Sequence, residues 1–329
     1  MVEASCNRLG KGDTSLSSSD VRESSSISIS FSVSDSYAQH LAVVITSILC
    51  HNPGSDFVFH VLHRDFSDEN MAKVKELENW GKVGENSLRT VSIRFHKIDS
   101  SLFDKFPIPP ELEHITQEMY YRYVLPEILA DESRTIYSDV DVLCVGDLRP
   151  LWEIDLKGNV LAAILDDKTG WKRDLLGLSK GDYFCSGLLV MDLAAMRQEN
   201  SKEKLFKTTS EYAAKLSWPD QDAINILFDG RIQALPEIWN CASTYNPFRR
   251  DVRQWHFQGF TQKPWCNIWK NTTWPIYLKY LCKSPFRANA VKFVLGHIKG
   301  FFFFKYTKKC ITRYLICGIR VWKRKDASK

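Results

Sequence analysis

The first hundred residues alternate between two spacings of apolar side chains. A period of two, which predicts β-strands, occurs in three runs: "SISISFSV", "DFVFHVLH" and "RTVSIRFHKI". Helical spacing occurs between them, in "SYAQHLAVVITSILCHN" and in "SDENMAKVKELENW". Ser67 is the expected cap of the second helix. Strand, helix, strand, helix, strand predicts an α/β unit with a largely parallel sheet.

The middle of the chain continues this alternation. The run "ITQEMYYRYVLPEIL" predicts a helix that is interrupted at Pro126. A short helix with Pro219 near its start is expected in "WPDQDAINILFDG". Further strands are expected in "TIYSDVDVLCV", "GNVLAAILDD" and "DYFCSGLLVMDL". Because no internal repeat and no sharp change of composition divides this body, we expect a single α/β body.

Both ends of the chain differ from this body. Residues 1–26 are rich in serine and poor in large apolar side chains, which predicts a disordered leader. Residues 271–329 are predicted to form a helical basic region. Residues 291–329 hold eleven of the 44 Lys and Arg residues but only one of the 39 acids. The remainder is therefore mildly acidic, and the charge asymmetry points to a partner of the tail.

The composition narrows the class of protein. Hydrophobic residues make up 44% and charged residues 25% of the chain, as in soluble globular proteins. The nine cysteines show no CxxC pair, and the first twenty residues lack the apolar stretch of a signal peptide. We therefore expect reduced thiols in a cytoplasmic protein, and neither a disulfide framework nor a zinc site. No segment reaches the roughly 18 uncharged apolar residues of a membrane span.

Two carboxylates, Asp139 and Asp141, stand inside one of the predicted strands. Side chains at positions i and i+2 of a strand leave the same face, and burying two like charges together is costly unless something pairs with them. Ligands of parallel sheets bind beyond the carboxyl ends of the strands. Two carboxylates placed there suit a hard divalent cation. The alternative is one turn acid and one exposed acid, since Asp-x-Asp sequences are common by chance.

Further acids follow other predicted elements. Asp166 and Asp167 end a second strand, and a simple connecting loop explains them equally well. Asp220 begins a predicted helix, where a carboxylate also favours the N-terminal dipole. Capping is therefore an alternative to a catalytic role for Asp220.

Four more residues are candidates for a binding site. His256 stands alone among aromatic residues and by itself predicts a structural histidine. Gly259 and Lys263 follow it, and a glycine with a lysine can hold a phosphate through backbone N–H groups and a point charge. Arg122, considered alone, predicts a surface cation.

Six segments occur in one order along the chain: "SVSDSYAQHLAVVITSI", "HITQEMYYRYVLPEIL", "IYSDVDVLCVGDLRPLW", "YFCSGLLVMDL", "WPDQDAINILF" and "HFQGFTQKPW". Together they resemble glycosyltransferase family 8, in particular the bacterial lipopolysaccharide galactosyl- and glucosyltransferases. The resemblance implies a nucleotide-sugar-binding catalytic domain of the A type across residues 27–270, with a Rossmann-like mixed sheet flanked by helices. It implies a retaining transfer from UDP-glucose or UDP-galactose, between which the sequence does not choose.

The resemblance also implies roles for individual residues. Asp139, Asp141 and His256 would bind Mn²⁺, which suits this set of oxygen and nitrogen ligands, although Mg²⁺ also fits. Asp220 and Gln221 would be the catalytic residues near the anomeric carbon. The donor-binding positions are Ser32, Ser36, Tyr37 and Val140 for the nucleotide, Arg122 and Asp166 for the sugar, and Gly259 and Lys263 for the diphosphate, with Asp139 shared between metal and donor.

The neutral amide of Gln221 is a poor nucleophile. We therefore expect front-face attack, with the leaving phosphate taking the acceptor proton, in preference to a covalent enzyme intermediate. Three features depart from the family pattern. Ser34 stands where an acid is usual, Cys185 stands where asparagine is common, and one extra residue separates His256 from Lys263.

The basic C-terminal segment mixes aromatic residues, such as Phe301 to Phe304, with Lys and Arg. This mixture is typical of a surface that lies at an anionic membrane interface. Nucleic acid also attracts such segments, but no nucleic-acid-binding motif accompanies this one, so we expect no nucleic-acid partner. A C-terminal helix packed on the body with solvated charges is the third interpretation.

We expect a cytoplasmic enzyme attached peripherally to the inner face of the membrane. Its expected acceptor is a lipopolysaccharide core or a related lipid-linked glycan. Two alternatives stay open: a protein or soluble glycan as the acceptor, and a non-catalytic membrane or nucleic-acid adaptor built on a transferase fold.

Overall fold

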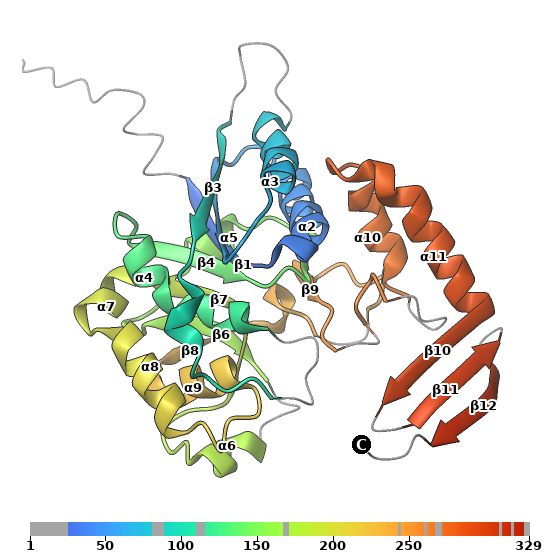
Figure 1. The fold of residues 1–329 in the computed structure, drawn as a ribbon. Helices are drawn as coiled ribbons and strands as arrows, with labels where there is room; N and C mark the ends of the chain where they lie inside the picture. Colours follow the sequence, from blue (N-terminus) through green and yellow to red (C-terminus); the bar gives the residue numbers. More distant parts are fainter. Residues whose placement is uncertain are drawn as a thin grey trace, which may run out of the picture.

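The computed structural model describes residues 26–80, 89–109, 116–166, 171–242, 245–259, 262–266, 272–308, 311–316 and 319–325. The predicted leader lies outside these ranges except for its last residue. A central sheet has the strand order β3-β2-β1-β4-β7-β6-β8 and is covered by helices (Figure 1). Its strands are β1 (Ile27–Ser32), β2 (Phe57–His63), β3 (Val91–Lys97), β4 (Arg134–Ser138), β6 (Leu161–Leu165), β7 (Phe184–Asp192) and β8 (Ile232–Leu235).

The sheet is mixed. β1 pairs in parallel with β2 and β4, and β2 with β3, as the alternating pattern predicts. β7 runs antiparallel to both of its neighbours, β4 and β6, while β6 and β8 are parallel. A separate pair of short antiparallel strands, β5 (Val142–Cys144) and β9 (Gln254–His256), lies beside the end of β4.

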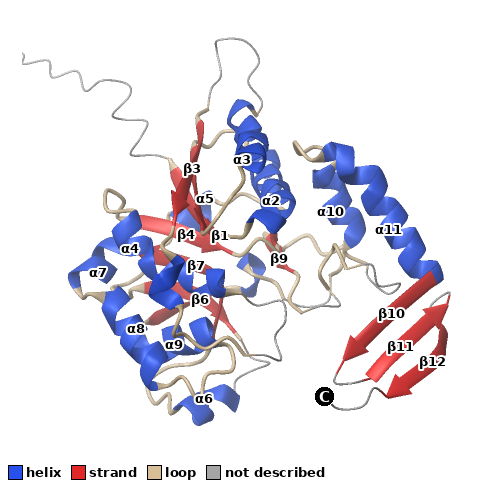
Figure 2. Cartoon of the chain, in the orientation of Figure 1, coloured by secondary structure: helices blue, strands red, loops and turns tan. Residues whose placement is uncertain are grey.

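Strands in the middle of the sheet contribute alternate side chains to two apolar cores, one on each face of the sheet. In β4, Ile136 packs into the core beneath α2, and Tyr137 packs into the core on the other face. Leu188 and Leu189 of β7 divide in the same way. Figure 2 shows the helices on both sides of the strands. They are α2 (Ala38–His51), α3 (Asp68–Lys75), α4 (Leu125–Ile128), α5 (Arg149–Trp152), α6 (Trp171–Leu176), α7 (Leu193–Gln198), α8 (Ser201–Glu211) and α9 (Pro219–Leu227).

Two local predictions can be compared with the structure directly. The Ser67 hydroxyl accepts a hydrogen bond from the Asn70 backbone N–H at the start of α3, which confirms the predicted cap. The helix predicted to be interrupted at Pro126 is instead a 3₁₀ helix over Gln117–Val124, and Pro126 lies in the first turn of α4. Proline has no N–H to donate, so it begins the α-helix and does not break one.

The C-terminal region begins with two helices, α10 (Trp274–Leu281) and α11 (Ala290–Phe302). α10 docks on α2, where Tyr277 hydrogen bonds with His40 (2.6 Å) and Tyr280 with His51 (2.9 Å). The helical prediction is wrong beyond Phe302. An antiparallel sheet of β10 (Phe303–Lys308), β11 (Ile311–Ile316) and β12 (Ile319–Lys325) follows, apart from the central sheet (Figure 1). The isoleucine, threonine and tyrosine residues of "ITRYLI" are of types that are enriched in strands.

Candidate active site

A cleft of about 500 Å³ opens just beyond the carboxyl ends of β1 and β4. This is the edge at which parallel sheets bind ligands. All of the predicted site residues except Ser36 line it: Ser32, Tyr37, Arg122, Asp139, Val140, Asp141, Asp166, Asp220, Gln221, His256, Gly259 and Lys263. The fold therefore gathers residues that are up to 231 positions apart in the chain.

The two carboxylates lie in a turn between β4 and β5, and the prediction of one continuous strand is wrong at this point. β4 ends at Ser138 and β5 begins at Val142, whose N–H donates to the Asp139 carbonyl at 3.2 Å. Val142 pairs with His256 across the two-stranded sheet, which brings the imidazole to the turn. One ligand atom from each of Asp139, Asp141 and His256 lies within 4.8 Å of the other two.

Each of the paired carboxylates has its own cation. Arg122 Nη2 donates to Asp139 Oδ1 at 3.1 Å, and the Tyr137 hydroxyl donates to the same oxygen at 3.0 Å. Asp141 forms an ion pair with Lys263, and its other oxygen lies 3.5 Å from His256 Nε2. Lys263, expected at a diphosphate, thus contacts a metal-ligand candidate in this structure.

Asp141 and His256 are buried, and their charges stabilise each other. Burial favours neutral Asp141, but Lys263 and His256 outweigh it and hold the pKa of this carboxyl well below its usual range. Burial also opposes the charged imidazole, yet Asp141 raises the pKa of His256 to about 10. A Cβ added at Gly187 would lie 2.4 Å from His256 Cε1 and 3.1 Å from Asp139 Oδ2. Glycine at this position is therefore what lets the histidine and the carboxylate share the site.

Arg122 is buried, and the interpretation of it as a surface cation is wrong. Its guanidinium stacks 4.1 Å from the centre of the Tyr137 ring and donates to the Ser186 carbonyl at 2.5 Å. It also lies 3.2 Å from Asp220 Oδ2, so one cation joins Asp139 to Asp220. The helical pattern around Arg122 could not show this, because the partners come from β7 and α9.

Asp220 and Gln221 are held at the start of α9 by Ser186 of β7 and by Tyr183, which directly precedes this strand. The Ser186 hydroxyl donates to Asp220 Oδ2 (3.0 Å), and the Ser186 N–H donates to Gln221 Oε1 (2.9 Å). Gln221 Nε2 donates to the Tyr183 hydroxyl (3.0 Å) and lies 3.4 Å from Asp166 Oδ2. Burial raises the pKa of Asp220, although Arg122 opposes this shift. Both the oxygen and the nitrogen of the Gln221 amide therefore form hydrogen bonds within the protein.

Behind these residues lies an ion pair that sequence reasoning missed. Lys172 Nζ donates to Asp222 Oδ1 at 2.6 Å, and both side chains are buried. Asp222 Oδ2 accepts the backbone N–H groups of Ser217 and Trp218, which fixes the turn before α9. Trp218 in turn lines the cleft. The only indication of this pair in the sequence is the second acid of "DQD", Asp222, because its partner Lys172 is 50 residues away from it.

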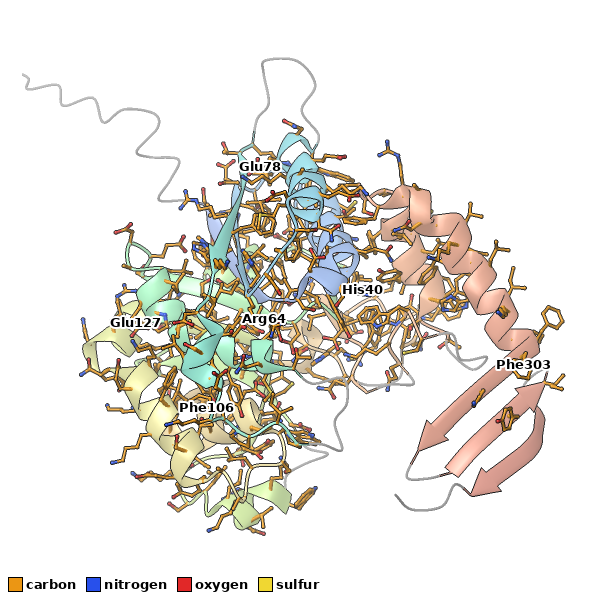
Figure 3. The ribbon with its side chains drawn as sticks, in the orientation of Figure 1. His40, Arg64, Glu78, Phe106, Glu127 and Phe303 are labelled. Carbon is orange, nitrogen blue, oxygen red and sulfur yellow. The ribbon has the colours of Figure 1, made fainter. Side chains whose placement is uncertain are left out.

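The other end of the cleft is aromatic. Tyr37 and Trp265 line it with ring centres 6.0 Å apart. The His40 ring stacks on Trp265 at 3.8 Å, at the end of α2 that faces the loops leading to α10 (Figure 3). Ser36 is exposed and lies outside the cleft. Its hydroxyl forms a hydrogen bond with the hydroxyl of Ser34, a residue that lines the cleft.

Asp35 is next to Ser34, the position where the family usually has an acid, but its side chain forms hydrogen bonds outside the cleft. Its Oδ1 accepts hydrogen bonds from the backbone N–H of Ser67 and the side-chain amide of Asn70, at the start of α3. It is therefore a structural acid and does not substitute for the acid missing at Ser34.

Residues 28–269 match the model of one protein family, Glycosyl transferase family 8. The chain belongs to this family. General stress protein A of Bacillus subtilis (strain 168) is 28% identical to this glycosyltransferase over 270 residues, which cover 75% of the chain and 90% of that protein. Lipopolysaccharide 1,2-glucosyltransferase of Escherichia coli (strain K12) is 25% identical over 324 residues, which cover 91% of this chain and 90% of that protein.

The solved structures include the galactosyltransferase LgtC in complex with donor and acceptor sugar analogs. It superposes on this glycosyltransferase with a TM-score of 0.66 and 27% identity, covering 78% of this chain and 96% of that one. The mixed sheet and this likeness confirm the predicted A-type glycosyltransferase fold. In the part of the chain that the structure describes, no helix is long and apolar enough to cross a membrane.

The residues at the turn suit a divalent metal ion. Two carboxylates and one imidazole form the kind of ligand set that Mn²⁺ accepts, and the three candidate ligand atoms are already gathered. The missing side chain at Gly187 leaves the space that this cluster needs.

Proposed function

We propose that this glycosyltransferase moves glucose or galactose, with retention of configuration, from a UDP-sugar to a lipopolysaccharide core or a related lipid-linked glycan, and that it depends on a divalent metal. The observation that carries this proposal is the cluster of Asp139, Asp141 and His256 inside a cleft that also holds Arg122 and Lys263. The similarity to an Escherichia coli lipopolysaccharide 1,2-glucosyltransferase supports the acceptor class, and the similarity to the galactosyltransferase LgtC, solved with donor and acceptor sugar analogs, supports the donor class.

Asp139, Asp141 and His256 would hold Mn²⁺, or Mg²⁺ in its place. When bound, the metal would neutralise the negative charge that develops on the departing diphosphate. Lys263 would contribute a second positive charge to the same phosphates, together with the backbone N–H groups near Gly259.

The nucleotide would lie along the aromatic end of the cleft. Tyr37 would stack near the uracil, and Ser32 and Val140 would contact the nucleoside. Ser36 is exposed and outside the cleft, so Ser34, whose hydroxyl lines the cleft, is the better candidate for this contact.

Arg122 and Asp166 would contact the donor sugar, with Asp220 and Gln221 near the anomeric carbon. A carboxylate close to this carbon stabilises the positive charge of an oxocarbenium-like transition state. Asp220 is held for this role by Arg122 and Ser186. The Gln221 amide is bonded to Ser186 and Tyr183, which supports a positioning role and front-face attack, with the leaving phosphate taking the acceptor proton.

The C-terminal region would attach the enzyme peripherally to the inner face of the membrane in the cytoplasm. Val291, Leu295, Ile298 and Phe302 follow the helical spacing of one face of α11, and all four are exposed. Phe303, labelled in Figure 3, continues the apolar series at the start of β10 and is also exposed. An exposed apolar face in a segment whose sequence holds eleven Lys and Arg residues fits a surface with anionic lipid.

The catalytic proposal is tested by measuring UDP release from a panel of UDP-sugars and glycan acceptors, with and without Mn²⁺. Metal-dependent release with one sugar, lost in Asp141→Asn and kept in Asp182→Asn, is expected. Asp182 is a matched control because it is an exposed aspartate paired with Arg173. Full activity in Asp141→Asn would contradict the metal site.

The membrane proposal is tested by flotation with vesicles that contain anionic lipid. Leu295→Glu with Ile298→Glu should release the protein from the vesicles. Leu175→Glu, on an exposed leucine of α6, should leave binding intact. Equal vesicle binding by both variants would overturn the assignment of the α11 face.

A further inference from the structure

The side chain of Gln258 contacts the ring nitrogen of His256 that faces away from Asp141. His256 Nε2 lies 3.5 Å from Asp141 Oδ1, whereas His256 Nδ1 lies 3.2 Å from the Gln258 side-chain amide nitrogen. The Gln258 backbone N–H donates to the His256 carbonyl at 3.0 Å. This tight turn folds the Gln258 side chain back onto the ring, inside the cleft.

The position of the His256 ring is fixed by its surroundings. The residue is buried, and its strand pairs with β5 through Val142. A Cβ at Gly187 would already collide with the ring. Because the ring is enclosed, the main property left to its neighbours is which of the two nitrogens keeps its proton when a cation binds.

A cation bound through Nε2 needs the lone pair of that nitrogen, so the proton must lie on Nδ1. Metal-binding histidines nearly always donate this second N–H to an acceptor. A carboxamide presents either nitrogen or oxygen to a neighbour by a half-turn about its last bond. Oε1 placed at the present site of Nε2 would accept from His256 Nδ1, and from the thiol of Cys185, whose Sγ is 3.3 Å from the same amide atom. Cys185 Sγ itself is 3.9 Å from Nδ1 and is a weak acceptor.

We propose that Gln258 is a positioning residue of the metal site: its amide oxygen accepts the Nδ1 proton of His256 and keeps the imidazole in the tautomer that binds a divalent cation through Nε2. This inference rests on the proposed function, because it requires a metal at Asp139, Asp141 and His256. It assigns metal affinity to a residue outside the ligand set, at a position that the family resemblance did not single out.

The test compares Gln258→Leu with Gln258→Glu in the full chain, by calorimetric titration with Mn²⁺ alone. Leucine keeps the bulk and has no acceptor, so Mn²⁺ affinity should fall by about 10- to 100-fold. Glutamate keeps an acceptor oxygen at the same reach, so Mn²⁺ affinity should not fall. In the Mg²⁺-loaded protein, ¹⁵N NMR of the ring should report the proton on Nδ1 of His256 in the wild type and in Gln258→Glu. Circular dichroism checks that both variants fold.

Two outcomes would overturn the inference while leaving the metal site intact. One is wild-type Mn²⁺ affinity in Gln258→Leu when Asp141→Asn has lost binding. The other is an equal loss in both Gln258 variants, since the loss would then come from packing and not from the acceptor. Failure of the wild type itself to bind Mn²⁺ would instead refute the metal-dependent part of the proposed function, and this inference with it.

Discussion

Asp141 and Asp222 are both buried aspartates paired with a lysine, yet their surroundings differ in kind. The carboxylate of Asp222 is fully enclosed by donors from the protein. Lys172 Nζ (2.6 Å) and the Tyr183 hydroxyl (2.5 Å) donate to Oδ1, and the N–H groups of Ser217 (2.8 Å) and Trp218 (3.0 Å) donate to Oδ2. A buried carboxylate satisfied in this way is a structural element, because nothing more is needed to balance it.

Asp141 belongs to a cleft in which negative charge is in excess. Among the described residues that line this cleft there are five carboxylates: Glu118, Asp139, Asp141, Asp166 and Asp220. Their cationic neighbours in the lining are Arg122 and Lys263, together with His256. The comparison separates two uses of the same residue type. A buried carboxylate whose charge is balanced by protein groups stabilises the fold. Excess negative charge at a cleft is instead available to bind a cation.

Removing the charge of Asp222 should produce the largest change in stability. In Asp222→Asn the buried Lys172 loses its counter-charge, so the free energy of unfolding should fall by about 3–5 kcal/mol. Urea denaturation of the variant and the wild type measures this difference. Asp182→Asn, at an exposed ion pair, is the control and should change stability by less than about 1 kcal/mol. A similar small effect at Asp222 would show that its enclosure is not what stabilises the turn before α9.

The same substitution at Asp141 should instead remove activity. UDP release should fall at least about 100-fold, which corresponds to about 2.7 kcal/mol of transition-state stabilisation. Stability should change less than in Asp222→Asn, because His256 can release its proton and the partly exposed Lys263 can reach water. Kinetic assays and urea denaturation of both variants give the full comparison. Equal losses of stability in both would remove the distinction between the two sites.

The alternation of strand and helix periods was enough to predict the central α/β body and most of its elements. The cluster of metal-ligand candidates was accessible only through the family resemblance, because Asp-x-Asp sequences are common by chance and His256 alone predicted a structural histidine. Its geometry was less accessible. The sequence suggested one strand, whereas Asp139 and Asp141 lie in a turn that ends β4 and begins β5.

The predictions that failed concern residues whose contacts come from segments far away in the sequence. Arg122 looked like a surface cation because its partners, Ser186 and Asp220, are 64 and 98 residues away. The Lys172–Asp222 pair and the contact of Gln258 with His256 were missed for related reasons: a single sequence gives no information on which side chains meet. The prediction of helix beyond Phe302 failed because the basic and aromatic composition dominated it, although β-branched and aromatic residues typical of strands were present.

Metal binding should stabilise the intact cleft and distinguish it from the enclosed pair. At a Mn²⁺ concentration 100 times Kd, the free energy of unfolding of the wild type should rise by about 2.7 kcal/mol. Asp139→Asn should abolish this gain, while Asp222→Asn should keep it on a lower baseline. Thermal unfolding with Mn²⁺ and with EDTA measures both. A gain that survives in Asp139→Asn would place the stabilising ion elsewhere.

The effect that is expected to be smallest near neutral pH concerns His40, which is kept neutral where α2 and α10 meet the aromatic end of the cleft. Burial against Trp265 and Tyr277, with the nearby charge of Lys263, lowers the pKa of His40 to about 3, although Asp141 opposes this shift. The unfolded chain therefore binds a proton at a higher pH than the folded one. As the pH falls from about 6.5 toward about 3, stability should be lost by up to about 1.4 kcal/mol per pH unit from this group. His40→Gln keeps a polar side chain without the titration, so its stability should depend less steeply on pH across this window. Urea denaturation at several pH values measures the slopes. His51→Gln, at the neighbouring tyrosine contact, should change the slope in the same direction, because burial also lowers the pKa of His51. Parallel slopes in His40→Gln and the wild type would mean that folding does not shift the pKa of His40.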